Sequence, residues 1–199
     1  MGFTDSENYS SSMYAWNGRW LSLGELVNIL PELWEKIAEE KGVSVRVLKN
    51  SIPRSITGRS GISSLIINGN DLSLTCKGEN YSGSVSFIRR NTLSVKRSGT
   101  RFLVLDERGR EVYSYYSFQS VYEQEISFGI YTYKLDGLPF RYAAFTDIDE
   151  NTENTSGRSF HAYFVNDEKD ILKFGHICTF VYDDDTKAEL IHRLFHQHN

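Results

Sequence analysis

Cysteine is scarce in this sequence, with two residues in 199, so a disulfide scaffold is excluded. The five histidines have no cysteine partners in the spacing of a structural zinc site, and we expect neither a metal centre nor a cofactor. No apolar run approaches the ~18 residues that a membrane helix needs. The first residues, Met1 to Asp5, lack the charged and apolar segments of a secretory signal, so we expect a cytoplasmic protein without a transmembrane segment.

Motifs typical of nucleotide and hydrolase sites are also lacking. The glycine-containing stretch 56–62 has no Gly-Lys-Ser or Gly-Lys-Thr ending, and no Gly-x-Ser-x-Gly nucleophile elbow occurs. Arg193 follows His192 where the helix of a zinc protease needs glutamate. We therefore predict that the protein is not an enzyme. A small hydrolase or nuclease that uses His161, His176 or His192 stays an alternative.

What is present indicates a globular protein. Apolar residues make up 40% and charged residues 24%, which is ordinary for a folded chain. The length suits one domain, at roughly 100–200 residues per domain. We divide the chain into a flexible, serine-rich tail at 1–21, a helical element with a loop at 22–61, and a β-rich domain at 62–199.

The N-terminal part carries a helical pattern. Ser22 and Glu25 form a capping box ahead of apolar residues that recur at 3.6-residue spacing and end at Gly42. Pro31 lies inside this pattern, so it predicts either a kink or the first residue of a second helix. The pattern predicts an amphipathic helix over 22–41.

From residue 63 onward the apolar period changes to two. Asn68-Gly69 predicts a hairpin with a type I′ turn, and Thr186 with Glu189 predicts the start of a closing helix. Between them we expect strands at 83–88, 92–97, 101–105, 111–118, 125–134, 139–146, 159–165 and 174–182. The expected fold is α+β: mainly an antiparallel sheet or open barrel, with an N-terminal amphipathic helix and a C-terminal capping helix.

The net charge of −4 is unevenly distributed. Segments 1–41 and 111–199 are acidic, whereas 42–110 carries a net +8, mostly from arginine. This excess indicates an anionic partner such as a phosphoinositide or a nucleic acid, unless neighbouring acidic strands neutralise it. The candidate anion-binding residues, on either side of an expected turn at Asn91, are Arg89, Arg90, Lys96 and Arg97.

The C-terminal third combines a strand at 140–145, an acidic loop, strands at 160–165 and 176–182, and a helix that ends in Leu194-Phe195. This order resembles the end of phosphotyrosine-binding domains, which have the pleckstrin-homology-like fold. The resemblance implies a non-catalytic adaptor module that docks a peptide of a partner protein between the strand at 139–146 and the last helix. The implied peptide-binding residues, for which core packing is the alternative, are Arg141, Tyr142, Ala143, Phe145, Ile191, Leu194 and Phe195.

Three further groups carry side chains that could in principle bind a metal or react. His192 and His196 lie at i and i+4 on the predicted last helix, so they either help to hold a metal with His176 or an aspartate of 183–185, or are simply solvated. Cys76 and Cys178 are expected to be buried thiols. The acidic run around Asp147, Asp149 and Glu150 lacks the pattern of a calcium loop and is expected to be a solvated loop.

Overall fold

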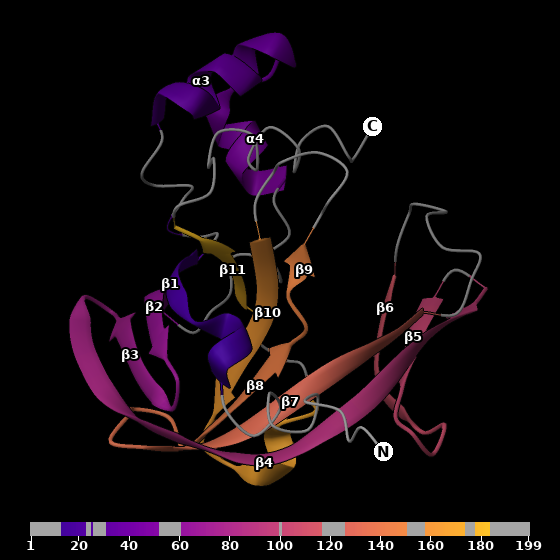
Figure 1. The fold of residues 1–199 in the computed structure, drawn as a ribbon. Coiled ribbons are helices and arrows are strands. Elements are labelled where there is room, and N and C mark those ends of the chain that lie inside the picture. The colour runs from indigo at the N-terminus through magenta and orange to yellow at the C-terminus, as the bar shows by residue number, and fades with distance from the viewer. Residues whose placement is uncertain are drawn as a thin grey trace, which may run out of the picture.

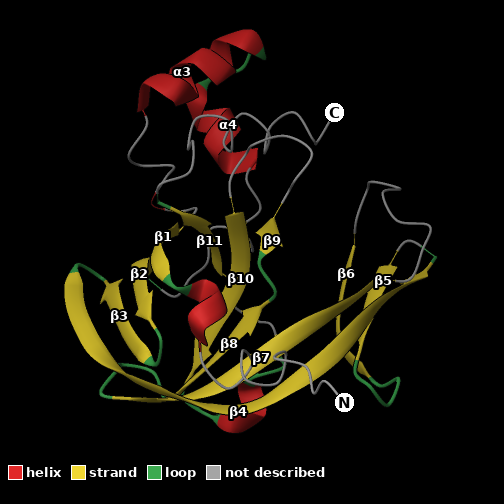
Figure 2. Ribbon diagram, viewed as in Figure 1, coloured by secondary structure: helices red, strands yellow, loops and turns green. Residues whose placement is uncertain are grey.

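The computed structural model describes residues 13–22, 25, 31–51, 61–99, 101–116, 126–150, 158–173 and 178–183. Antiparallel strands dominate these residues, and helices are few (Figures 1 and 2). The strands are β1 (Gly18–Ser22), β2 (Ile62–Asn68), β3 (Asp71–Cys76), β4 (Glu79–Ser98), β5 (Arg101–Leu105), β6 (Glu111–Tyr116), β7 (Ile126–Asp136), β8 (Tyr142–Thr146), β9 (Asp149–Glu150), β10 (Arg158–Val165) and β11 (Cys178–Tyr182). The predicted β-rich, antiparallel α+β class is therefore confirmed.

Eight strands close into a ring in the order β3, β2, β1, β11, β10, β8, β7 and β4, because β4 also pairs with β3. The long strand β4 makes this closure possible. Its first half pairs with β3 and its second half with β5, while β7 pairs with β4 from Ser84 to Val95. Strands β5 and β6 therefore extend the sheet away from the ring, as Figure 1 shows.

Two tight turns join the first hairpins. The predicted hairpin at Asn68-Gly69 is present as β2–β3, but φ is positive at Gly69 (61°) and not at Asn70, so the turn is not type I′. The β3–β4 turn, by contrast, has positive φ at both Lys77 (52°) and Gly78 (84°), which a type I′ turn requires.

The turn predicted at Asn91 is wrong. Asn91 pairs with Ile130 in an unbroken ladder, and β4 continues through it to Ser98. The register irregularity between Phe87 and Arg89 lets the strand bend as it leaves the ring. One bulged strand thus replaces the two separate strands that the sequence predicted.

Aromatic side chains fill the interior of the ring. Trp20, Tyr133, Phe145, Phe160 and Phe180 are each at most 1% exposed. Their rings contact one another at centroid separations such as 4.6 Å for Trp20–Phe160 and 5.7 Å for Tyr133–Phe145. Because large rings occupy it, the interior is a packed core that stabilises the ring through buried apolar area.

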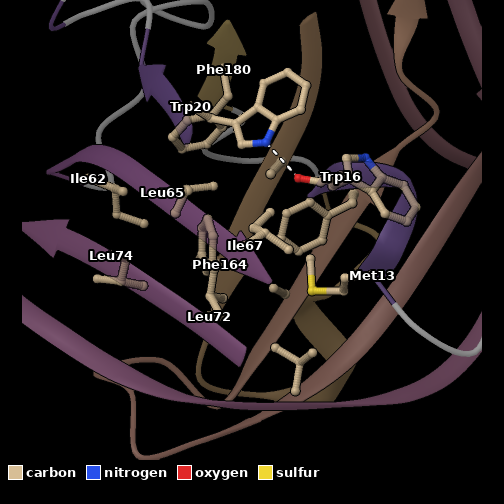
Figure 3. Close-up of a cluster of buried hydrophobic side chains, with 14 of the residues drawn as sticks. Met13, Trp16, Trp20, Ile62, Leu65, Ile67, Leu72, Leu74, Phe164 and Phe180 are labelled. Carbon is tan, nitrogen blue, oxygen red and sulfur yellow. Dashed lines mark hydrogen bonds between the residues drawn. The ribbon is translucent and has the colours of Figure 1, made fainter. Parts of the chain in front are cut away.

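The segment ahead of β1 covers one end of this core. It contains the short 3-10 helix η1 (Met13–Trp16), and Met13 and Trp16 are almost completely buried. The Nε1 of Trp20 donates a hydrogen bond to the carbonyl of Trp16 (2.7 Å; Figure 3). The Nε1 of Trp16 donates to the carbonyl of Thr146 (3.2 Å), so both of these indole N–H groups are satisfied. Asn17 also accepts a hydrogen bond from the backbone of Gly69 (2.7 Å).

A second apolar cluster lies on the outer face of the sheet. Leu93, Ile130, Ala144 and Tyr163 come from β4, β7, β8 and β10, and the segment after the short helix η2 (Glu168–Asp170) adds Ile171. Both faces of this part of the sheet are therefore packed.

The helices are α3 (Pro31–Glu40) and α4 (Val45–Ser51), which Figure 1 places beyond one end of the ring. Helix α3 begins at Pro31, one of the two outcomes that the sequence left open. The Ser22 Oγ accepts a hydrogen bond from the backbone of Glu25 (3.2 Å), as a capping box requires. The predicted C-terminal helix lies outside the described residues. None of the described helices is long and apolar enough to cross a membrane.

Candidate functional site

The ends of β8, β10 and β11 present a row of polar side chains around His161. Phe160 and Ala162 belong to the interior core, so the alternation along β10 directs the exposed His161 to the outer face. Its backbone N–H donates to the Oγ1 of Thr146 (2.9 Å), and its Nδ1 lies 2.9 Å from the Oγ1 of Thr179. Because His161 and Thr179 are register partners, the sheet itself sets the orientation of the imidazole.

A second polar cluster lies where β4 and β7 leave the ring. The Nε of Arg90 donates to the hydroxyl of Tyr131 (3.1 Å), and the Oδ2 of Asp147 accepts from the backbone of Gly129 (3.0 Å). Burial raises the pKa of Tyr131, Arg90 opposes this effect, and Asp147 adds to it. A Cβ at Gly129 would lie 2.9 Å from the Asp147 carboxylate and 3.1 Å from the Arg90 Nε, so a side chain there would have to displace these two groups.

These two groups of donors do not converge on one metal ion. The imidazole of His161 is oriented by β11, whereas the carboxylate of Asp147 is held against β7. Across the described residues, no three His, Cys, Asp or Glu side chains lie close enough together to hold a metal. The described donors alone therefore do not form a zinc centre, and His161 is the one histidine among them.

The sequence did not identify Thr146, Thr179 or Tyr131 as neighbours of these groups. Thr146 and His161 are 15 residues apart, and Arg90 and Tyr131 are 41 apart. Strand pairing alone brings such positions together, so no local spacing could have revealed them. The alternation of Phe160, His161 and Ala162 was the available signal that His161 points away from the core.

The predicted peptide-binding strand has no free edge. Strand β8 pairs with β7 on one side and β10 on the other, while Ala143 and Phe145 are fully buried in the core and Tyr142 is half-buried. Arg141 is exposed, but its backbone N–H donates to Val165 (3.1 Å). An added peptide strand needs unpaired backbone groups, which β8 lacks. Ile191, Leu194 and Phe195 lie outside the described residues.

The four predicted anion-binding cations are exposed but do not converge. Successive strand residues point to opposite faces, so Arg90 and Lys96 share one face while Arg89 and Arg97 share the other. Arg90 and Lys96 are six residues apart, roughly 20 Å along the strand. The four cations therefore lie on the two faces of one continuous strand, and not on two adjacent strands as the expected phosphate cluster required.

Comparison with known proteins identifies a fold. No protein-family model matches the sequence, and no curated protein matches it. The structure is similar to that of Zn(II)-bound AdcA from Streptococcus pneumoniae, with a TM-score of 0.53 and 12% identity over 96% of this chain and 37% of that one. It is also similar to the separately solved Zn(II)-bound ZinT-like domain of AdcA, with the same score and identity, over 96% of this chain and 94% of the domain.

At this identity the likeness shows a shared fold, that of a ZinT-like domain, and this chain spans little more than a third of full AdcA. It corrects two predictions. The resemblance to phosphotyrosine-binding and pleckstrin-homology-like domains is wrong, since a ZinT-like domain matches nearly the whole chain. The peptide-docking adaptor function is wrong as well, and the paired edges of β8 give the physical reason.

Proposed function

We propose that this chain binds a divalent transition-metal ion such as zinc, with His161 as one ligand. The observation that carries the proposal is the fold, which a Zn(II)-bound ZinT-like domain shares over 96% of this chain. Imidazole is a preferred zinc ligand, and His161 is exposed on the outer face of β10.

The surroundings of His161 support this role. Metal-ligating histidines are commonly oriented by a hydrogen bond at the second ring nitrogen, and here the Oγ1 of Thr179 lies 2.9 Å from Nδ1. Thr179 is itself buried, at 8% exposure, so its hydroxyl is a fixed partner.

At least one of the other ligands has to come from outside the described residues, because the described part of the chain holds no group of three suitable side chains. The sequence offers four histidines there, at 176, 192, 196 and 198. The expected absence of enzymatic activity and the cytoplasmic location remain predictions alongside this proposal.

The test is a zinc titration of the full chain against a competing chromophoric chelator. We expect one equivalent of zinc to bind, and His161→Ala to weaken the affinity by about 100-fold or more. Thr179→Val, which keeps the shape of the side chain but removes the hydroxyl, should weaken it about 10- to 100-fold. The zinc affinities of the variant His176→Ala and of the double variant His192→Ala with His196→Ala, each measured separately, locate the remaining ligands.

Thermal unfolding of each variant without metal checks that the fold is intact. The proposal fails if the wild-type chain takes up no zinc at about 100 µM, or if folded His161→Ala binds zinc as tightly as the wild type. A loss confined to the variants of the other histidines would likewise exclude His161 as a ligand.

A further inference from the structure

The dipeptide Asn-Gly occurs twice in the chain, at Asn17-Gly18 and at Asn68-Gly69. In such a pair the backbone nitrogen of the glycine can attack the side-chain amide of the asparagine, because glycine has no side chain to block the approach. Asn17 and Asn68 are both exposed, so water reaches their amides. Both are therefore candidates for deamidation, a covalent modification that consumes only water.

One hydrogen bond connects the two pairs. The Oδ1 of Asn17 accepts from the backbone N–H of Gly69 (2.7 Å), although the two residues are 52 positions apart. The bond therefore engages the side chain of the first pair and the attacking nitrogen of the second. Gly69 is also buried, and a Cβ there would lie 3.4 Å from the ring of Tyr14, so Tyr14 shields this part of the turn.

We propose that Asn17 and Asn68 are deamidation sites that this one hydrogen bond restrains together. While the bond is intact, the Asn17 side chain is not free to turn toward the nitrogen of Gly18, and the nitrogen of Gly69 keeps its proton. Local opening of the segment that contains η1 and Asn17 releases both sites at once. The inference does not depend on metal binding.

The reaction at Asn68 is a substitution followed by a hydrolysis. The Gly69 nitrogen loses its proton and forms a bond to Cγ of Asn68, ammonia leaves, and a cyclic succinimide results. Water then opens the ring at one of its two carbonyl carbons. Cleavage at Cγ gives aspartate, whereas cleavage at the backbone carbonyl gives isoaspartate, so water is consumed, ammonia is released and nothing is oxidised or reduced.

The products would weaken the hairpin in which they form. Asn68 pairs with Asp71 at the end of β2–β3, so an aspartate at position 68 would lie opposite a second carboxylate, which like charges disfavour. Isoaspartate would add a carbon atom to the backbone and disturb the register of the strand. Deamidation thus marks a chain in which the segment ahead of β1 has opened, and it also loosens the turn that this segment binds.

Three variants separate the hydrogen bond from a general disturbance of the turn. Asn17→Ala removes the acceptor of the Gly69 N–H. Asn17→Asp keeps an oxygen acceptor, and its negative charge opposes the loss of the Gly69 proton. Asn70→Ala is the matched control, because it truncates another exposed side chain of the same turn and leaves the bond to Asn17 in place.

Peptide mapping by mass spectrometry of the full chain, incubated under mildly alkaline conditions, measures deamidation at each asparagine. We expect Asn17 and Asn68 to convert at least about tenfold more slowly in the folded wild type than in denaturing urea. Asn17→Ala should speed the conversion of Asn68 in the folded chain about 2- to 10-fold, the factor that corresponds to one net hydrogen bond. Asn17→Asp and Asn70→Ala should not exceed the wild-type rate.

Hydrogen exchange of the Gly69 amide in the wild type measures the same bond without a substitution, and it should be slower than in the unfolded chain. Four results would overturn the inference. They are conversion in the folded wild type as fast as in urea, an unchanged rate in Asn17→Ala, an equal acceleration in Asn70→Ala, and a Gly69 amide that exchanges as in the unfolded chain. If Asn17→Ala fails to fold, the exchange of the Gly69 amide decides alone.

Discussion

Tyr133 offers the sharpest test of the packing inside the ring. It is 0% exposed, and its hydroxyl finds no hydrogen-bond partner among the residues that the structure describes. Burial also raises the pKa of Tyr133, which keeps the phenol neutral. Around it lie the rings of Trp16 (6.4 Å), Phe87 (5.7 Å) and Phe145 (5.7 Å), none of which accepts a conventional hydrogen bond.

Tyr133→Phe removes the hydroxyl oxygen and leaves the ring in place. A buried, unpaired hydroxyl costs about 1–3 kcal/mol, and the lost contacts of one oxygen atom offset part of that gain. We therefore expect the free energy of unfolding to rise by about 1 kcal/mol. For a chain of this length the midpoint temperature should rise by about 2–4 °C.

The matched control is Tyr131→Phe, two residues earlier on the same face of β7. Its hydroxyl accepts a hydrogen bond from Arg90, so its loss should destabilise the protein by about 0.5–1.5 kcal/mol. Urea unfolding with equal m-values measures both variants. If Tyr133→Phe destabilises the protein by about 1 kcal/mol or more, the hydroxyl has a partner and the reasoning is refuted.

Two further predictions concern a close contact and a titrating group. A Cβ at Gly83 would overlap the carbonyl oxygen of Asp136. Gly83→Ala should therefore lower the free energy of unfolding by about 1–3 kcal/mol, as measured by urea unfolding. An unchanged urea midpoint would contradict this packing. Hydrogen bonds from the backbone and side chain of Arg110 hold the pKa of Asp106 below 3.8. The ionised Asp106 carboxylate therefore stabilises the folded protein at pH values above its ordinary pKa, and this stabilisation is lost as the pH falls through the lower pKa of the folded state. NMR titration of the Asp106 carboxyl should give a midpoint below 3.8 that rises in Arg110→Ala, and a midpoint at or above the ordinary value would exclude the contact.

Local patterns predicted much of the strand content. The alternation along 101–105 and 159–165 matches β5 and β10 within one residue, because a half-buried strand needs apolar residues at every second position. The Asn68-Gly69 turn was also predicted in the right place, because only a few residue types accept the positive φ that the turn needs. The capping hydrogen bond from the backbone N–H of Glu25 to the Ser22 hydroxyl also depends on residues close in sequence.

The candidate site was less predictable. His161 was recognised as a chemically capable residue, but its contact with Thr179 depends on the register of β10 against β11. The resemblance to phosphotyrosine-binding domains rested on a succession of strands and a helix, and many antiparallel folds share such a succession. Only the spatial order of the strands separates them, and local periodicity carries no information on that order.

By itself, the sequence determined that the chain forms mainly antiparallel strands, because the period of the apolar residues and the turn residues act over a few positions. The tertiary structure alone decided that β4 continues through Asn91, that it closes the ring by pairing with β3, and that β8 is enclosed on both sides. These outcomes depend on hydrogen bonds between residues far apart in the chain and on the packing of large rings from many strands, so no short stretch of sequence contains them.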